Sequence, residues 1–162
     1  HFTSIAGNFT VYKEDEDPKK RLPRYFDSIK GELTISFWIK LEEPSNKPII
    51  ETNNFKVEIE NDEIKVGIWL ETGWKYWDSG GTKLKRDAWT HVGIIYSNIT
   101  GKGETFINGR IVGKLGEDIK STFKPQEGAF TVGNFKGYMD ELRIYNRALS
   151  SGEIVMHFQG LY

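Results

Sequence analysis

The sequence predicts an all-β sandwich or barrel that is completed by one short carboxyl-terminal helix. Apolar and polar residues alternate along many short segments, and this period-two alternation is typical of half-buried β-strands. Turn-forming pairs such as Asn61-Asp62 and Asn108-Gly109 separate these segments at short intervals. Helical periodicity is absent before the last quarter of the chain, so an alternating α/β arrangement is not expected.

The first part of the chain contains the longest alternating run. Residues 7–13 alternate enough for one strand, whereas residues 14–24 are charged, contain prolines and are expected to form a loop. Every second residue of the segment 31–40 is apolar, which places one set of side chains on a single face: Leu33, Ile35, Phe37 and Ile39. A turn cluster at 42–48 ends this strand.

A hairpin and a short strand follow. Residues 55–59 and 64–70 alternate on either side of the Asn-Asp pair at 61–62, a reversal of the length that primed turns prefer. Residues 73–77 are expected to add a short strand, and the Ser-Gly-Gly sequence at 79–81 is expected to interrupt it.

The clearest hairpin lies in the second half of the chain. It follows the segment 89–96, which is apolar on parts of both faces and is therefore a candidate central strand. The Asn-Gly pair at 108–109 joins 105–107 to 111–112 and suits a type I′ turn, because both central residues need a positive φ. Two more strands are predicted over residues 128–132 and 137–145.

A capping box predicts where the helix begins. Ser150 supplies a side-chain acceptor for a backbone N–H of the first turn, and Glu153 lies three residues further on, where it can bond the N–H of the cap. We expect the helix to end at about His157 or Phe158.

Composition restricts the classes of function. With 162 residues, the chain fits a single domain over residues 1–162 with a substantial core. A net charge of −1 provides no general attraction for nucleic acid, and no segment approaches the length of a membrane span. The absence of cysteine excludes disulfides, thiolate metal sites and a cysteine nucleophile. Because the chain begins at His1 rather than Met, we expect it to be a module of a longer protein.

Four segments resemble, in the same order, those of one family: GELTISFWIK at 31–40, WTHV at 89–92, FINGRIV at 106–112 and YMDELRIYNRALS at 138–150. The last segment is the most specific and resembles the closing pattern of laminin-G-like domains. The resemblance implies a concanavalin A-like antiparallel β-sandwich, a jelly roll with one concave and one convex sheet. Members of this family include carbohydrate-binding modules, pentraxin-like lectins, adhesion modules and some glycosidases.

The resemblance also implies a structural calcium ion. In related domains the residue that matches Asp140 often binds a calcium ion that connects the last strand to the first, and such an ion prefers carboxylate and carbonyl oxygens. Asn8, in the amino-terminal segment, is the candidate second side-chain ligand. The alternative is that Asp140 pairs with Arg143 or Arg147, or caps a turn.

Four aromatic residues within nine positions are the candidate ligand-binding residues: Trp69, Trp74, Tyr76 and Trp77. Aromatic rings bind sugars through apolar C–H faces, and they lose little conformational entropy on binding. The neighbours of Trp69 are expected to face the core, so Trp69 should face away from it, while Trp74 and Tyr76 share one face and Trp77 takes the other. The alternative is that these rings fill the sandwich or shield its edge. Trp38 is a further candidate for an exposed ring.

Three glutamates provide a test for catalysis. Glu58, Glu60 and Glu63 approximate the carboxylate series of laminarinase-type glycosidases, which need an acid and a nucleophile on either side of the sugar bond. In those enzymes the series runs along one strand, whereas here the turn at 61–62 interrupts it. We therefore expect outward-facing charges on a hairpin and no catalytic residues.

These observations favour a non-catalytic binding module of a secreted or cell-surface protein that recognises a polysaccharide or a glycoprotein glycan. Its other partners would be further domains of the parent chain, with no nucleic acid and no membrane insertion. Two alternatives remain open: an adhesion or structural module that binds another extracellular protein, and a glycosidase-like domain. Glycosylation acceptor patterns at Asn8 and Asn98 are consistent with an extracellular module.

Overall fold

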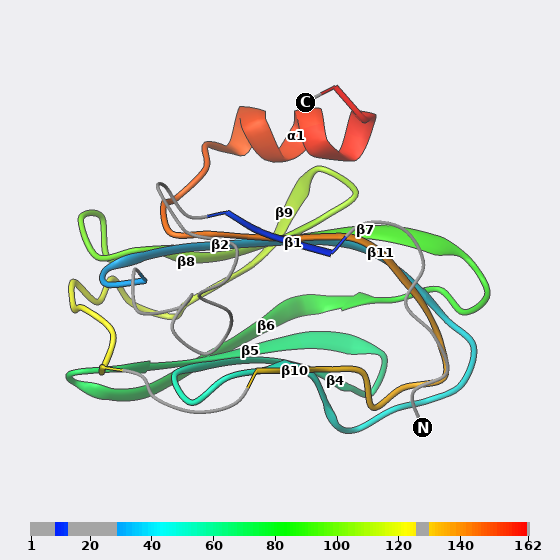
Figure 1. Ribbon diagram of the computed structural model, residues 1–162, viewed down its shortest axis with the longest axis horizontal. Helices are drawn as coiled ribbons and strands as arrows, with labels where there is room; N and C mark the ends of the chain where they lie inside the picture. The colour runs from blue at the N-terminus through cyan, green and yellow to red at the C-terminus, as the bar shows by residue number, and fades with distance from the viewer. Residues whose placement is uncertain (1–8, 13–28, 126–129, 162) are drawn as a thin grey trace, which may run out of the picture.

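The structure, a computed structural model, describes residues 9–12, 29–125 and 130–161. Two β-sheets pack face to face, and helix α1 (Ser151–Gln159) lies on the outer surface of one of them (Figure 1). The predicted all-β jelly-roll sandwich with one short carboxyl-terminal helix is thus confirmed. The loop expected at 14–24 lies outside the described residues.

In the described part of the chain, the sheet beneath the helix has six strands. Their order across the sheet is β1 (Phe9–Tyr12), β11 (Gly137–Tyr145), β2 (Glu32–Leu41), β7 (Trp89–Ser97), β8 (Gly103–Ile107) and β9 (Arg110–Lys114). Neighbouring strands are antiparallel, except that β1 runs parallel to β11 at the edge of the sheet. The backbone of Phe9 lies opposite Leu142, so the first described strand pairs directly with the last.

The second sheet has five antiparallel strands among the residues that the structure describes. Their order is β10 (Thr131–Val132), β3 (Pro48–Glu51), β4 (Phe55–Glu60), β5 (Glu63–Leu70) and β6 (Gly73–Lys83). The turn between β4 and β5 places Asn61 and Asp62 at φ values of 52° and 63°, as a primed turn requires. Asn108 and Gly109 adopt the same combination, at 50° and 78°, between β8 and β9.

Strand β6 is longer than its sequence predicts. The expected interruption at 79–81 is wrong, because the strand continues to Lys83. Gly80 and Gly81 take positive φ values of 60° and 85°, and the pairing with β5 shifts between Glu63 and Lys65. The two glycines therefore act as an irregularity within the strand rather than as its end.

The core lies between the two sheets and is built from alternating residues of the facing strands. The apolar set of β2 is fully buried, as predicted. Opposite it, β4 and β5 contribute a second buried set: Phe55, Val57, Ile59, Ile64, Val66, Ile68 and Leu70. Each such side chain contributes about 1.5–3 kcal/mol by leaving water, which is why the alternation specifies the inner face so strongly.

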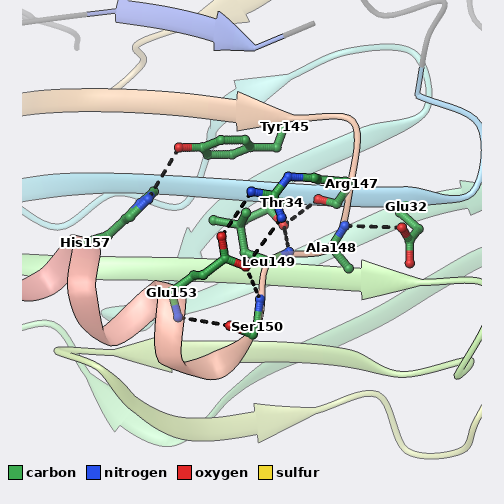
Figure 2. Close-up of polar contacts among 9 residues, drawn as sticks. All are labelled: Glu32, Thr34, Tyr145, Arg147, Ala148, Leu149, Ser150, Glu153 and His157. Atoms are coloured by element: carbon green, nitrogen blue, oxygen red, sulfur yellow. Dashed lines mark hydrogen bonds and ion pairs between the residues drawn. The ribbon is translucent and has the colours of Figure 1, made fainter. Parts of the chain in front are cut away.

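The capping box begins α1 as predicted. Ser150 accepts a hydrogen bond from the backbone N–H of Glu153, and the Glu153 carboxylate accepts one from the Ser150 N–H (Figure 2). The ion pair with Arg147, at 3.0 Å, together with these bonds lowers the pKa of Glu153 to about 2. The helix ends at Gln159, where Gly160 adopts the left-handed conformation of a C-cap.

A buried hydroxyl attaches the chain before α1 to the sheet. Thr34 of β2 donates from Oγ1 to the carbonyl of Arg147 at 2.8 Å and accepts from the N–H of Leu149 at 2.9 Å (Figure 2). Glu32 accepts a longer bond from the N–H of Ala148. These bonds satisfy backbone groups that the close approach of helix and sheet removes from water.

Candidate functional site

Three of the four predicted aromatic residues lie together on the outer face of the five-stranded sheet. Trp69 of β5 lies directly opposite Trp74 of β6, and Tyr76 follows two residues along β6. Trp74 and Tyr76 are 37% and 45% exposed, and Trp69 is half-buried. Helix α1 lies on the other sheet, on the opposite side of the molecule (Figure 1). Trp69, Trp74 and Tyr76 are called the aromatic ladder below.

The rings of the ladder are stacked nearly parallel to one another. The ring centroids of Trp69 and Trp74 lie 6.0 Å apart with planes 5° apart, and those of Trp74 and Tyr76 lie 5.8 Å apart with planes 14° apart. These centroid distances fall within the range of about 4.5–7 Å that aromatic pairs prefer. The three rings therefore form one continuous row across β5 and β6.

A glycine makes room for this arrangement. Gly67 of β5 lies opposite Tyr76, and a Cβ atom at Gly67 would stand 2.7 Å from Cε1 of that tyrosine. The same atom would stand 3.2 Å from Cε of Lys56. The Tyr76 ring thus leans across β5 at Gly67, which has no side chain to block it.

Lysine side chains surround the ladder. Lys56 places Nζ 5.2 Å from the ring centroid of Trp74 and 5.5 Å from that of Tyr76. Lys65 places its Nζ 5.6 Å from the ring centroid of Tyr76, and Lys124 places its Nζ 6.0 Å from that of Trp69. Such cation–π contacts contribute about 0.5–1 kcal/mol each at exposed positions, so they hold the rings in place.

Each of these lysines also forms an ion pair: Lys56 with Glu58 at 3.3 Å, Lys65 with Glu60 at 3.4 Å, and Lys124 with Glu71 at 3.6 Å. Burial is the largest single influence and acts to lower the pKa of Lys56, but the hydrogen bond and the charge of Glu58, together with Tyr76 and Glu51, outweigh it and raise that pKa above its usual value. The sequence-based prediction missed Gly67 and the three lysines. Counting back from the turn at 61–62 places Lys56 and Lys65 on the face of Trp69, so this signal was available for two of them.

Trp77 does not belong to the ladder. It points inward from β6, is only 5% exposed, and donates from Nε1 to Oγ1 of Thr105 at 2.8 Å. Its ring lies against Gly103, where a Cβ atom would stand 2.8 Å from Cζ3. The prediction of Trp77 as a ligand-binding residue is therefore wrong, because this ring fills the space between the sheets.

Trp38, the further candidate for an exposed ring, is not exposed either. It faces outward from β2, as the alternation predicts, but α1 covers it. Its ring centroid lies 5.2 Å from that of His91 and 5.8 Å from that of Phe158 of the helix. The two sheets thus differ: on one outer face the helix covers Trp38, which is half-buried, and on the other face Trp74 and Tyr76 stay exposed.

A hollow adjoins the ladder at the edge of the sandwich. Trp74, Lys75 and Tyr76 form one side of it, and the other side is lined by Leu115, Gly116, Glu117 and Ile119. The exposed end of the ladder therefore continues into a depression between β6 and the segment that follows β9. An elongated ligand on the rings could extend into this depression.

The three glutamates considered for catalysis lie on the β4–β5 hairpin, as predicted. Glu60 and Glu63 are paired across its tip, and Glu58 lies two residues earlier on β4. Glu58 and Glu60 form the ion pairs given above, and Glu63 accepts a hydrogen bond from the N–H of Gly81 at 2.7 Å. All three carboxylates therefore have structural partners.

Asp140 pairs with Trp38 of β2, and an irregularity of β11 separates it from Arg143, which pairs with Ser36. Its Oδ1 accepts a hydrogen bond from the N–H of Glu141 at 2.7 Å, and Glu141 has a φ of 52°. Within the described residues, no group of three His, Asp or Glu side chains could hold a metal ion. Asn8, the other predicted ligand, lies outside the described residues.

A second exposed aromatic pair lies on the six-stranded sheet. Trp89 of β7 and Tyr138 of β11 are paired with Lys40 of β2 from either side, so the three residues form one row. Trp89 is 43% exposed and Tyr138 is 38% exposed.

No helix of the described part of the chain is long and apolar enough to cross a membrane.

Comparison with known proteins agrees with this architecture. Residues 17–155 match the family Laminin_G_3, which is described as the concanavalin A-like lectin/glucanases superfamily. A search of curated proteins found no match. Among solved structures, the binding domain of botulinum neurotoxin DC in complex with SialylT has a TM-score of 0.67 at 15% identity, over 88% of this chain and 38% of the toxin chain.

Two further structures share the fold. Domain 4 of the extracellular arabinanase AbnA from Geobacillus stearothermophilus, in complex with arabinotriose, has a TM-score of 0.59 at 22% identity, over 78% of this chain and 66% of that one. The heptameric SAP-like pentraxin from Limulus polyphemus has a TM-score of 0.55 at 17% identity, over 78% of this chain and 69% of that one. At these identities the likeness concerns the fold alone.

Proposed function

Because the chain belongs to the concanavalin A-like lectin/glucanases superfamily, we propose that it is a carbohydrate-binding module whose ligand lies on the aromatic ladder. One observation carries this proposal: three nearly parallel rings stand on an outer sheet face, and two of them are exposed. Exposed rings present apolar surface to the C–H faces of sugar units, while nearby lysines and glutamates offer hydrogen bonds to the hydroxyl groups.

The similar structures support this proposal. Domain 4 of the arabinanase was solved with arabinotriose, and the toxin binding domain was solved with SialylT. The chain spans 38% of the toxin chain, so we propose that it acts as one module of a larger secreted or cell-surface protein. We propose no catalytic role, since each glutamate of the β4–β5 hairpin has a structural partner.

Alanine substitutions of the exposed rings test the proposal. Trp74→Ala and Tyr76→Ala should each weaken binding on a glycan array by about tenfold or more, because exposed aromatic residues dominate the energetics of such contacts. Trp89→Ala and Tyr138→Ala remove rings of similar exposure from the other sheet and are the matched controls. Equal losses in all four variants, or none in any, would contradict a site on the ladder.

A structural calcium ion is a second part of the proposal. Asp140 has the ligand chemistry, and the parallel pairing of β1 with β11 brings the amino-terminal strand to the same edge of the sheet. The described residues supply one carboxylate, so Asn8 and backbone carbonyls would have to complete the site. If calcium binds, a chelator should lower the melting temperature of the unsubstituted chain but not that of Asp140→Asn. An unchanged melting temperature of the unsubstituted chain would contradict the calcium site.

The row of Trp89, Lys40 and Tyr138 favours a second candidate function, adhesion to another protein. Two exposed aromatic rings beside a long side chain provide the kind of anchor that protein interfaces use. This candidate predicts the reverse outcome from the same four variants. Trp89→Ala would then reduce binding of the parent protein to its target surface, and Trp74→Ala would not.

A further inference from the structure

The pairing of strands determines which charges surround the aromatic ladder. One row across the five-stranded sheet is formed by Glu51, Lys56, Gly67 and Tyr76. The next row is formed by Glu58, Lys65 and Asp78. Directly opposed residues of antiparallel strands point to the same side, so all these charges share the outer face with the rings.

Carboxylates outnumber lysines on this face. Among the described residues, its lysines are Lys56, Lys65, Lys83 and Lys124, and its carboxylates are Glu51, Glu58, Glu60, Glu63, Glu71 and Asp78. The three lysines beside the rings, Lys56, Lys65 and Lys124, each lie within 3.3–3.6 Å of a glutamate oxygen. The amino groups near the rings are therefore already neutralised, and the surroundings of the ladder are negative rather than positive.

This balance discriminates between classes of sugar. A carboxylated or sulfated sugar on the rings would lie within one screening length, about 8 Å at physiological salt, of carboxylates that repel it. To bind a lysine it would first have to displace that lysine's glutamate. A neutral sugar meets neither penalty, because its hydroxyl groups can donate to the carboxylates and accept from the amino groups.

We propose that the aromatic ladder selects neutral glycan chains and rejects carboxylated or sulfated ones. This inference rests on the proposed function, since it assumes that the ladder is the binding surface. It assigns opposite tasks to the two kinds of side chain. The rings supply contact area, and the paired glutamates prevent the lysines from attracting polyanions.

Binding measurements with the whole chain test this selectivity. The neutral probes are arabinan, laminarin and galactomannan, and the anionic probes are polygalacturonate and chondroitin sulfate, each at low and at physiological ionic strength. The best neutral probe should bind at least about tenfold more tightly than either anionic probe. Its affinity should change by less than about twofold with salt, because no net charge is neutralised on binding.

A charge-altering variant tests the role of the glutamates. Glu58→Gln with Glu60→Gln frees Lys56 and Lys65 and should produce binding of the anionic probes that weakens as salt is added. Binding of the neutral probe should remain independent of salt in this variant, because that probe carries no charge. Glu42→Gln with Glu43→Gln is the matched control, since it makes the same change in net charge near Lys136, away from the ladder. Equal gains in both double variants would overturn the inference.

Trp74→Ala separates failure of the inference from failure of the proposed function. One outcome is that an anionic probe binds the unsubstituted chain more tightly than every neutral probe does, and that Trp74→Ala abolishes that binding. In that case the ladder is a glycan site and the selectivity inference is overturned. If no probe binds in a way that depends on Trp74, the proposed function fails and the inference fails with it. Neutral binding that depends on Trp74 and does not respond to salt supports both.

Discussion

The hydroxyl oxygen of Ser36 lies 3.1 Å from Nδ1 of His157, although 121 residues separate the two in the chain. The same oxygen lies 3.0 Å from Nε2 of His91, and Nε2 of His157 lies 3.3 Å from the hydroxyl of Tyr145. A chain of donors in either direction fits these distances. The direction that leaves no proton on the unpartnered Nδ1 of His91 has His91 donating from Nε2 to Ser36, Ser36 donating to Nδ1 of His157, and His157 donating from Nε2 to Tyr145.

This order of donors requires both histidines to be neutral. Nδ1 of His91 is buried and has no hydrogen-bond partner among the described residues, so a proton there would have no acceptor among them. Burial lowers the pKa of His91 to about 4, with smaller contributions from His157 and Arg143. Burial and Arg143 also lower the pKa of His157. The contact between α1 and the six-stranded sheet is therefore sensitive to acid.

We predict that stability falls as the pH drops from about 6.5 towards 4. In this window the unfolded chain binds a proton at His91 and the folded chain does not, so protons favour unfolding. The depressed pKa corresponds to a loss of about 3 kcal/mol across the window. Urea unfolding at several pH values measures the effect. His91→Gln should flatten the dependence, and an unchanged slope in that variant would refute the assignment.

Thr34→Val should destabilise the protein by about 1–3 kcal/mol. Valine matches the shape of threonine but leaves the carbonyl of Arg147 and the N–H of Leu149 without their partner. Thr34→Ser retains the hydroxyl and is the control, with a smaller loss from the missing methyl group. Denaturant unfolding of both variants provides the comparison, and equal losses would show that packing rather than hydrogen bonding matters here.

Trp77→Phe should reduce stability but not glycan binding. Phenylalanine cannot donate to Oγ1 of Thr105, and the smaller ring leaves space against Gly103. The expected cost is about 1–3 kcal/mol from the unsatisfied hydroxyl and the lost packing. Trp74→Phe, at the exposed position, is expected to show the reverse pattern. A Trp77→Phe variant that folds normally but loses glycan affinity would place this ring at the binding surface after all.

Gly67→Ala should weaken glycan binding without removing any ring. The new Cβ atom would stand 2.7 Å from Cε1 of Tyr76, so the tyrosine must move away from its position beside Trp74. We expect an affinity loss of about tenfold, comparable with that of Tyr76→Ala. Gly152→Ala is the control, since the nearest atom to its Cβ would be 3.8 Å away. Full affinity in Gly67→Ala would mean that the orientation of the Tyr76 ring does not matter for glycan binding.

Local patterns were sufficient for most strands and for the helix. The alternation in the segment 31–40, the turn pairs at 61–62 and 108–109, and the capping box of Ser150 and Glu153 each act within a few residues. The Ser-Gly-Gly sequence at 79–81 was misleading, because the contact of β6 with β5 and β9 decides whether that backbone continues as a strand.

Alternation along a strand also predicted which rings share a face, and it correctly separated Trp74 and Tyr76 from Trp77. It carries no information about what covers that face, because a covering element comes from elsewhere in the chain. Trp38 and Trp74 both point outward from their sheets, yet α1 covers only Trp38. The bonds that place the helix join Thr34 to residues more than one hundred positions away. Long-range contacts of this kind, which no local pattern encodes, place α1 over the six-stranded sheet. The aromatic ladder on the other sheet therefore stays exposed.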